Sequence, residues 1–153
     1  MKKFFFYALI VMLVSQVSFA SQNAAKLQHP LKFIIEKTLA LKNKKYNPAI
    51  PLPTFHFSSS TPLVQFQDAI EKQWGFRPDF ITNAYAFANN EIYIMDDFDY
   101  YETQKRCIDD SVSHEIVHYI QDKYMGWDLN DESLEWDAIE IQTQFREKYC
   151  KIP

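Results

Sequence analysis

The sequence contains only two glycines among its 153 residues, so it lacks the Gly-rich loops with which many proteins cradle phosphate groups. It also lacks a basic stripe, because 20 aspartate and glutamate residues outnumber 16 lysine and arginine residues, for a net charge of −4. This acidic balance argues against nucleic acid and anionic membrane surfaces as partners.

Long apolar runs are absent except at the N-terminus, where residues 1–20 read MKKFFFYALIVMLVSQVSFA. Lys2 and Lys3 precede an apolar run that is shorter than the ~20 residues of a membrane-spanning helix, and small residues surround the end at Ala20. This order is typical of a signal peptide with cleavage after Ala20. We expect a bacterial protein in the periplasm or secreted, without a stable membrane anchor after cleavage, whose net charge goes from −4 to −6 with the loss of two lysines.

Closely spaced cysteines are absent too, because the two cysteines of the chain are Cys107 and Cys150. They do not form the CxxC spacing that is common in metal sites. In an oxidising compartment such a pair is more often bridged than free, so an intramolecular disulfide Cys107–Cys150 is predicted, with two separate thiols as the alternative.

The remaining residues, 21–153, are enough for a single domain with its own core. Apolar periodicity and turn residues predict an α+β fold in which a small sheet packs on a long helix and a further helix lies behind it. The predicted helices cover residues 29–47, 61–75, 103–125 and 131–149, and the predicted strands cover 54–59, 81–87 and 91–95. The last two strands form a hairpin, and an acidic loop at 96–102 follows them.

The predicted helix 103–125 carries the sequence His114-Glu115-Ile116-Val117-His118. Residues four apart lie one turn from each other on the same helix face, so both imidazoles can reach one zinc ion. Glu115 is rotated by about 100° around the helix, which places it to act as a general base on a zinc-activated water rather than as a ligand. The alternative is that all three are ordinary helix residues without a metal.

A catalytic zinc site needs a third protein ligand, and the last predicted helix offers several carboxylates. Glu135 lies one turn into that helix, whereas Glu132 is at its start and Glu140 is on a different face. The other histidines, His29 and His56, lie far upstream. The sequence therefore predicts one Zn²⁺ ion with three ligands: His114, His118 and Glu135.

The motif HEIVH on one helix, followed by Glu135-Trp136-Asp137-Ala138 on the next, resembles the gluzincin zinc metallopeptidases. The likeness is strongest to small single-domain bacterial members of uncharacterised role, which carry HExVHxxQ and ExxAxxxQ, matched here by Gln121 and Gln142. It covers about residues 81–149. The resemblance implies a zincin-like fold, in which the β-hairpin packs on the HExxH helix and one of its strands offers an open edge to an extended peptide.

One position departs from the family pattern. Many gluzincins have an aspartate four residues after the ligand glutamate, where it orients a zinc histidine, but this chain has Ile139. Asp110, Asp137 or a backbone carbonyl are the candidates for that role. Candidate donors to the oxyanion of peptide hydrolysis are Tyr119, Tyr124, Tyr149, Arg146 and His56.

The resemblance implies an exported zinc metallopeptidase with a peptide or protein substrate and with Glu115 as the catalytic base. The alternative is a catalytically inactive zincin-like protein with a binding or structural role. Ile139 favours the alternative, whereas the retained Glu115 argues against it, because a purely structural metal site has no use for this carboxylate.

Overall fold

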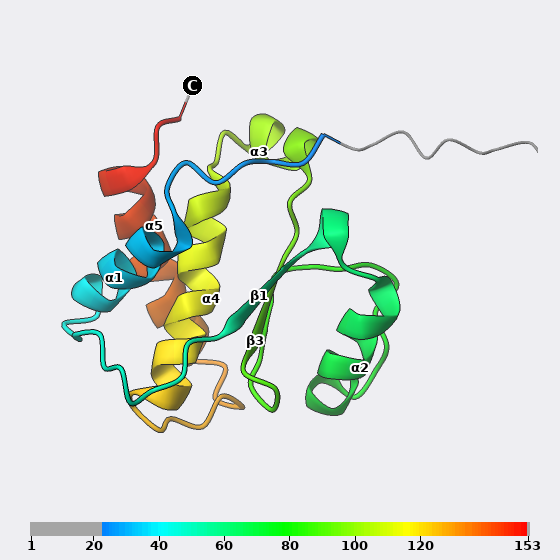
Figure 1. Ribbon diagram of the computed structural model, residues 1–153, viewed down its shortest axis with the longest axis horizontal. Helices are drawn as coiled ribbons and strands as arrows, with labels where there is room; N and C mark the ends of the chain where they lie inside the picture. The colour runs from blue at the N-terminus through cyan, green and yellow to red at the C-terminus, as the bar shows by residue number, and fades with distance from the viewer. Residues whose placement is uncertain (1–22, 153) are drawn as a thin grey trace, which may run out of the picture.

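The computed structural model describes residues 23–152, so the predicted signal peptide at residues 1–20 lies outside the described residues. The described part is an α+β fold with five α-helices and one three-stranded sheet (Figure 1). Its elements are α1 (Leu31–Leu41), β1 (Thr54–Phe57), the short 3₁₀ helix η1 (Ser58–Ser60), α2 (Leu63–Trp74), β2 (Ala84–Ala86), β3 (Glu91–Ile94), α3 (Phe98–Gln104), α4 (Ile108–Lys123) and α5 (Leu134–Tyr149). None of the helices in this part has both the length and the apolar character needed to cross a membrane.

The sheet has the strand order β1-β3-β2, with β3 parallel to β1 and antiparallel to β2. The predicted hairpin is confirmed, and Asn90 in its turn adopts a left-handed backbone conformation with φ 54°. Because β3 is the central strand, β2 is the member of the hairpin that lies at an edge of the sheet.

Side chains of the sheet alternate between two apolar clusters. Ile92 and Ile94 point into the main core, which they share with α1, α4 and α5, whereas Ala84, Ala86 and Tyr93 pack with α2. Helix α4 therefore lies between the sheet and the pair α1 and α5, and α2 covers the opposite face of the sheet (Figure 1).

The predicted helix 103–125 is two helices in the structure. Lys105 has a left-handed backbone conformation with φ 48° and separates α3 from α4. The residues predicted as an acidic loop begin α3, because the Asp97 carboxylate accepts hydrogen bonds from the backbone N–H groups of Asp99 and Tyr100. The apolar stripe predicted for the second part is buried: Ile108, Val112, Ile116, Tyr119 and Ile120.

The predicted starts of α2 and α5 are wrong, and α1 spans Leu31–Leu41 rather than residues 29–47. The Thr61 hydroxyl donates to the carbonyl of Phe57 at 2.7 Å instead of capping α2, whose first residue follows Pro62. Helix α5 begins at Leu134 rather than at Asp131. In both places a turn precedes the helix, which the apolar periodicity does not reveal.

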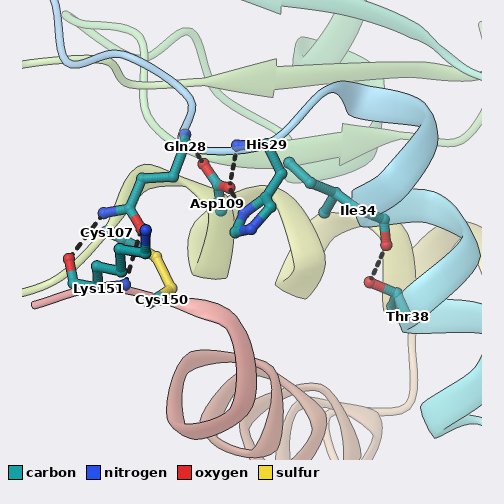
Figure 2. Close-up of polar contacts among 8 residues, drawn as sticks. All are labelled: Gln28, His29, Ile34, Thr38, Cys107, Asp109, Cys150 and Lys151. Carbon is teal, nitrogen blue, oxygen red and sulfur yellow. Dashed lines mark hydrogen bonds and ion pairs between the residues drawn. A yellow bond between two sulfur atoms is a disulfide. The ribbon is translucent and has the colours of Figure 1, made fainter.

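The predicted disulfide between Cys107 and Cys150 is present and joins the start of α4 to the end of α5 (Figure 2). The two cysteines are 43 residues apart, and closing a loop of this length stabilises the folded state by about 4 kcal/mol on chain-entropy grounds. The bridge therefore holds together the two helices that carry the histidine motif and Glu135.

Hydrogen bonds beside the disulfide attach Gln28 and His29, just before α1, to the same region (Figure 2). The Gln28 side chain donates to the carbonyl of Lys151 at 2.9 Å and accepts from its N–H at 2.8 Å. Asp109, which is fully buried, accepts from the backbone N–H groups of Gln28 and His29 and contacts His29 Nδ1 at 2.9 Å. The segment before α1 is thus fixed to the start of α4 and to the residues that follow α5.

Candidate metal centre

His114 and His118 lie one turn apart on α4 and face Glu135 in the first turn of α5. His118 Nε2 is 3.2 Å from His114 Nε2 and 3.2 Å from Glu135 Oε1. His114 Nε2 is 3.3 Å from Glu135 Oε2. The structure therefore brings together the three side chains that the sequence predicts as ligands, and neither Glu132 nor Glu140 belongs to this group.

The spacing of these atoms fits a tetrahedral metal site. Zinc binds imidazole nitrogen and carboxylate oxygen at about 2.0–2.1 Å, which at tetrahedral angles leaves neighbouring ligand atoms about 3.3–3.4 Å apart. The three separations are 3.2, 3.2 and 3.3 Å, and they join four atoms, because each imidazole faces a different oxygen of Glu135. The two imidazoles and the Glu135 carboxylate are therefore close enough to bind one ion together.

Gln142 of α5 sets the orientation of His114. Its Nε2 donates to Asp110 Oδ1 at 3.0 Å, and because a carboxylate only accepts, Gln142 Oε1 is the atom that faces His114 Nδ1 at 3.2 Å. The proton therefore belongs on Nδ1, and Nε2 is left free to bind a metal. Asp110 is fully buried and is paired with Arg106 and, at 3.6 Å, with Arg146.

Gln121 performs the same task for His118. Its Nε2 donates to the carbonyl of Leu134 at 3.1 Å and to Asp137 Oδ2 at 2.8 Å, so its Oε1 faces His118 Nδ1 at 2.9 Å. Asp137 is in turn paired with Lys42 of α1 at 2.6 Å. Each histidine is thus connected through one glutamine to one ion-paired aspartate.

These contacts correct the sequence-based expectation that Asp110, Asp137 or a carbonyl orients a histidine directly. Each aspartate acts through an amide instead, and Ile139 is 43% exposed and plays no part. Gln121 and Gln142 belong to the gluzincin-like motif of the sequence, but the motif alone assigns no role to them. Their signal is helical spacing, because Gln121 lies one turn after His118 and Gln142 lies two turns after the ligand glutamate.

Glu115 lies beside the ligand group but not in it. Its side chain is turned towards β2, and the residue is only 5% exposed. Burial raises the pKa of its carboxyl group, whereas the two imidazoles and the backbone N–H of Tyr85 lower it. The structure therefore places a buried, basic carboxylate next to the three converging side chains.

The charges around His118 favour a cation. Burial lowers the pKa of this imidazole, but the hydrogen bond to Glu135, the charges of Glu115 and Glu135 and the contact with Gln121 outweigh burial and raise the pKa to about 9. The hydrogen bond to His118 in turn lowers the pKa of the Glu135 carboxyl group. A metal ion is positively charged like the proton, so it can take the place of the proton as the partner of the same carboxylates.

The three side chains open into a cleft of about 260 Å³. The motif of α4 forms one side of it, β2 and the end of α2 form a second, and the segment before α5 forms a third. The lining residues are Gln73, Trp74, Asn83, Ala84, Tyr85, His114, Glu115, His118, Leu129, Asp131, Glu132, Leu134 and Glu135.

None of the five predicted oxyanion donors is among these lining residues. Tyr119 and Tyr124 contact each other edge to face with their ring centroids 5.9 Å apart, and Tyr149 packs against Phe145 of α5. Arg146 and His56 lie next to acidic partners elsewhere in the fold. The structure therefore does not bring these five candidates into the cleft.

No family model matches this chain, and neither a curated protein nor a solved structure is significantly similar to it. The assignment of a function accordingly depends on the chemistry and geometry of the site.

Proposed function

We propose that this protein is an exported zinc metallopeptidase with a zincin-like fold, in which His114, His118 and Glu135 hold one Zn²⁺ ion and Glu115 is the general base. The observation that carries the proposal is the convergence of two imidazole nitrogens and the Glu135 carboxylate at 3.2–3.3 Å, in a cleft that also contains a buried glutamate. The gluzincin-like motif and the leader-like N-terminus support the activity and the export, respectively.

The chain's own residues support a hydrolytic reaction. A bound zinc ion would supply Lewis acidity towards a peptide carbonyl and an attacking water. Glu115 would accept the proton of that water and pass it to the leaving amine, so one carboxyl group must both bind and release a proton. Its position supports this role, because the residue is only 5% exposed and lines the cleft beside the three ligands.

The edge strand of the hairpin supports a peptide as the substrate. β2 lines the cleft and has β3 on one side only, so an extended peptide can add to its other side. Tyr85 fixes β2 relative to α4, because its hydroxyl donates to Asp122 at 2.8 Å. Of the two strands considered from the sequence, the edge position favours residues 81–87.

A zincin-like binding protein without catalysis is the second candidate. It is favoured by the cleft lining, which contains none of the five side chains predicted to stabilise an oxyanion. The two candidates differ in the fate of a bound peptide, because only the peptidase cleaves it.

Substitution of Glu115 by Gln tests the proposal. We expect Glu115→Gln to keep one zinc per chain and to lose about 10²–10⁴-fold in peptide hydrolysis, because the base is removed and the ligands remain. Zinc is measured by elemental analysis, and cleavage is measured with a fluorogenic peptide library in the presence and absence of a chelator. Glu140→Gln, on the exposed side of α5, is the matched control and should behave as wild type.

Three outcomes would contradict parts of the proposal. Unchanged turnover in Glu115→Gln would remove this residue from the mechanism. Zinc-loaded wild type that binds peptides without cleaving them would favour the binding protein. Equal zinc content in wild type and His118→Ala would exclude the metal site.

A further inference from the structure

The outward-facing backbone of β2 is already occupied in this structure. The Gln73 side chain, in the last turn of α2, donates from Nε2 to the carbonyl of Tyr85 at 3.1 Å. Its Oε1 accepts from the backbone N–H of Phe87 at 3.3 Å. One side-chain amide thus satisfies the carbonyl of Tyr85 in β2 and the N–H of Phe87, the residue that follows this strand.

This pair of contacts has the form of a β-ladder. A strand that adds to a sheet edge donates to a carbonyl and accepts from an N–H on either side of one residue, which here is Ala86. The amide of Gln73 therefore substitutes for one residue of a neighbouring strand. Gln73 and Tyr85 also line the cleft that holds the candidate metal site, so the occupied stretch lies where a bound peptide would run.

We propose that the Gln73 side chain is an internal competitor for the peptide substrate, because it occupies backbone groups of β2 that the substrate main chain would use. This inference rests on the proposed function and narrows its substrate class. A peptide that pairs along Tyr85 and Phe87 has to displace Gln73, whereas a short peptide that ends before this stretch does not. The protein therefore discriminates against long extended chains.

Protection of an edge strand is the simpler alternative. Proteins often cover sheet edges to prevent strand pairing between molecules, and a capping glutamine serves that purpose without any substrate. The two explanations differ in their consequences for binding. A competitor changes the affinity for long peptides selectively, whereas a purely protective cap changes aggregation or stability only.

Two substitutions separate the hydrogen bonds of Gln73 from its volume. Gln73→Met keeps the length of the side chain without its amide, and Gln73→Ala removes both. Gln67→Ala is the matched control, because Gln67 lies on the same helix and also donates to a backbone carbonyl, that of Pro78 at 2.9 Å, but does not line the cleft. All variants are compared in the zinc-loaded full-length mature protein.

We expect both Gln73 variants to lower KM for a long unstructured peptide by about three- to tenfold, with kcat unchanged, because two competing hydrogen bonds are gone. KM for a blocked dipeptide should stay the same, and Gln67→Ala should match wild type for both. Binding of the long peptide to zinc-loaded Glu115→Gln, measured by fluorescence anisotropy with and without Gln73→Met, should tighten by the same factor without any contribution from cleavage.

The inference is overturned if long peptides bind Gln73→Met and wild type equally, or if only Gln73→Ala binds more tightly, since the second result would indicate steric exclusion. Both results leave the peptidase assignment intact. If no peptide binds any zinc-loaded variant, the proposed function fails and this inference fails with it.

Discussion

The two histidines of the candidate metal centre are supported by the same chain of groups in different surroundings. Behind His114, the chain runs through Gln142 to Asp110, which is 0% exposed and is held by two arginines next to the disulfide. Behind His118, it runs through Gln121 to Asp137, which is 29% exposed and paired with Lys42. The series of contacts behind His114 ends in the core, whereas the series behind His118 ends near the surface.

This difference indicates that the orientation of a metal ligand and the stability of the fold depend on different residues. The aspartate behind His114 is a structural centre that also holds α4 and α5 together, so its loss affects the whole domain. The glutamine behind His118 is fully buried and held by two acceptors, so its loss acts mainly on the ligand. We therefore expect the contacts behind His114 to contribute more to the free energy of unfolding. The contacts behind His118 should contribute more to zinc affinity.

Removal of the two aspartate charges gives the largest expected effect. Asp110→Asn should lower the free energy of unfolding by about 2–4 kcal/mol, because a buried carboxylate with two arginine partners is lost. Asp137→Asn should cost only about 1 kcal/mol, because that carboxylate is partly exposed. Urea denaturation of the metal-free proteins measures both values, and equal costs would contradict the comparison.

Replacement of the two glutamines sharpens the comparison at the ligands. Gln121→Met and Gln142→Met should each weaken zinc binding by about 10–100-fold, because the imidazole loses the group that fixes its tautomer and orientation. The larger effect is expected for Gln121, the more deeply buried of the two. Competition with a chromogenic chelator measures zinc affinity, and Gln144→Met on α5 is the control. Wild-type affinity in both variants would show that the amides do not orient the ligands.

The pH dependence of the metal-free protein tests the charge of His118. The folded state raises the pKa of His118 from its ordinary value of 6.5 to about 9, so it binds this proton more tightly than the unfolded chain does. The resulting stabilisation, on the order of 1–3 kcal/mol, should be complete below pH 6.5 and should disappear as the pH rises through about 9.

Zinc at a fixed, limiting concentration should reverse this trend, since the ion competes with the same proton and binds more tightly as the pH rises. Denaturation between pH 6 and 10 with and without zinc measures both slopes. His118→Gln is the control and should flatten the metal-free curve. A metal-free curve of opposite slope would refute the assigned charge of His118.

Much of this organisation follows from local sequence patterns. The two histidines share a face of α4 because they are four residues apart, and the stripe from Ile108 to Ile120 buries the opposite side of that helix. The hairpin follows from two β-rich segments around the turn at Asn90. Backbone details were less predictable, because the break at Lys105 depends on a left-handed residue that is neither glycine nor proline.

The choice among polar partners could not be made from spacing. Asp110 and Asp137 were reasonable candidates to contact the histidines, but each lies one amide further away. The distance depends on how closely α4 and α5 approach, and the small buried Ala138 between them is part of that packing. The same holds for the oxyanion candidates, since a tyrosine in a helix can face the core or the cleft.

The sequence alone determined which groups are available to this protein: a histidine pair on one helical turn, a glutamate beside it, an acid on the next helix and two cysteines able to bridge. Such groups are fixed by residue type and by short-range helical geometry. The tertiary structure alone decided which amides orient the histidines, and that Gln73 lies on the edge of β2. Those contacts join residues far apart in the chain, and their distances arise only when the helices and the sheet pack together.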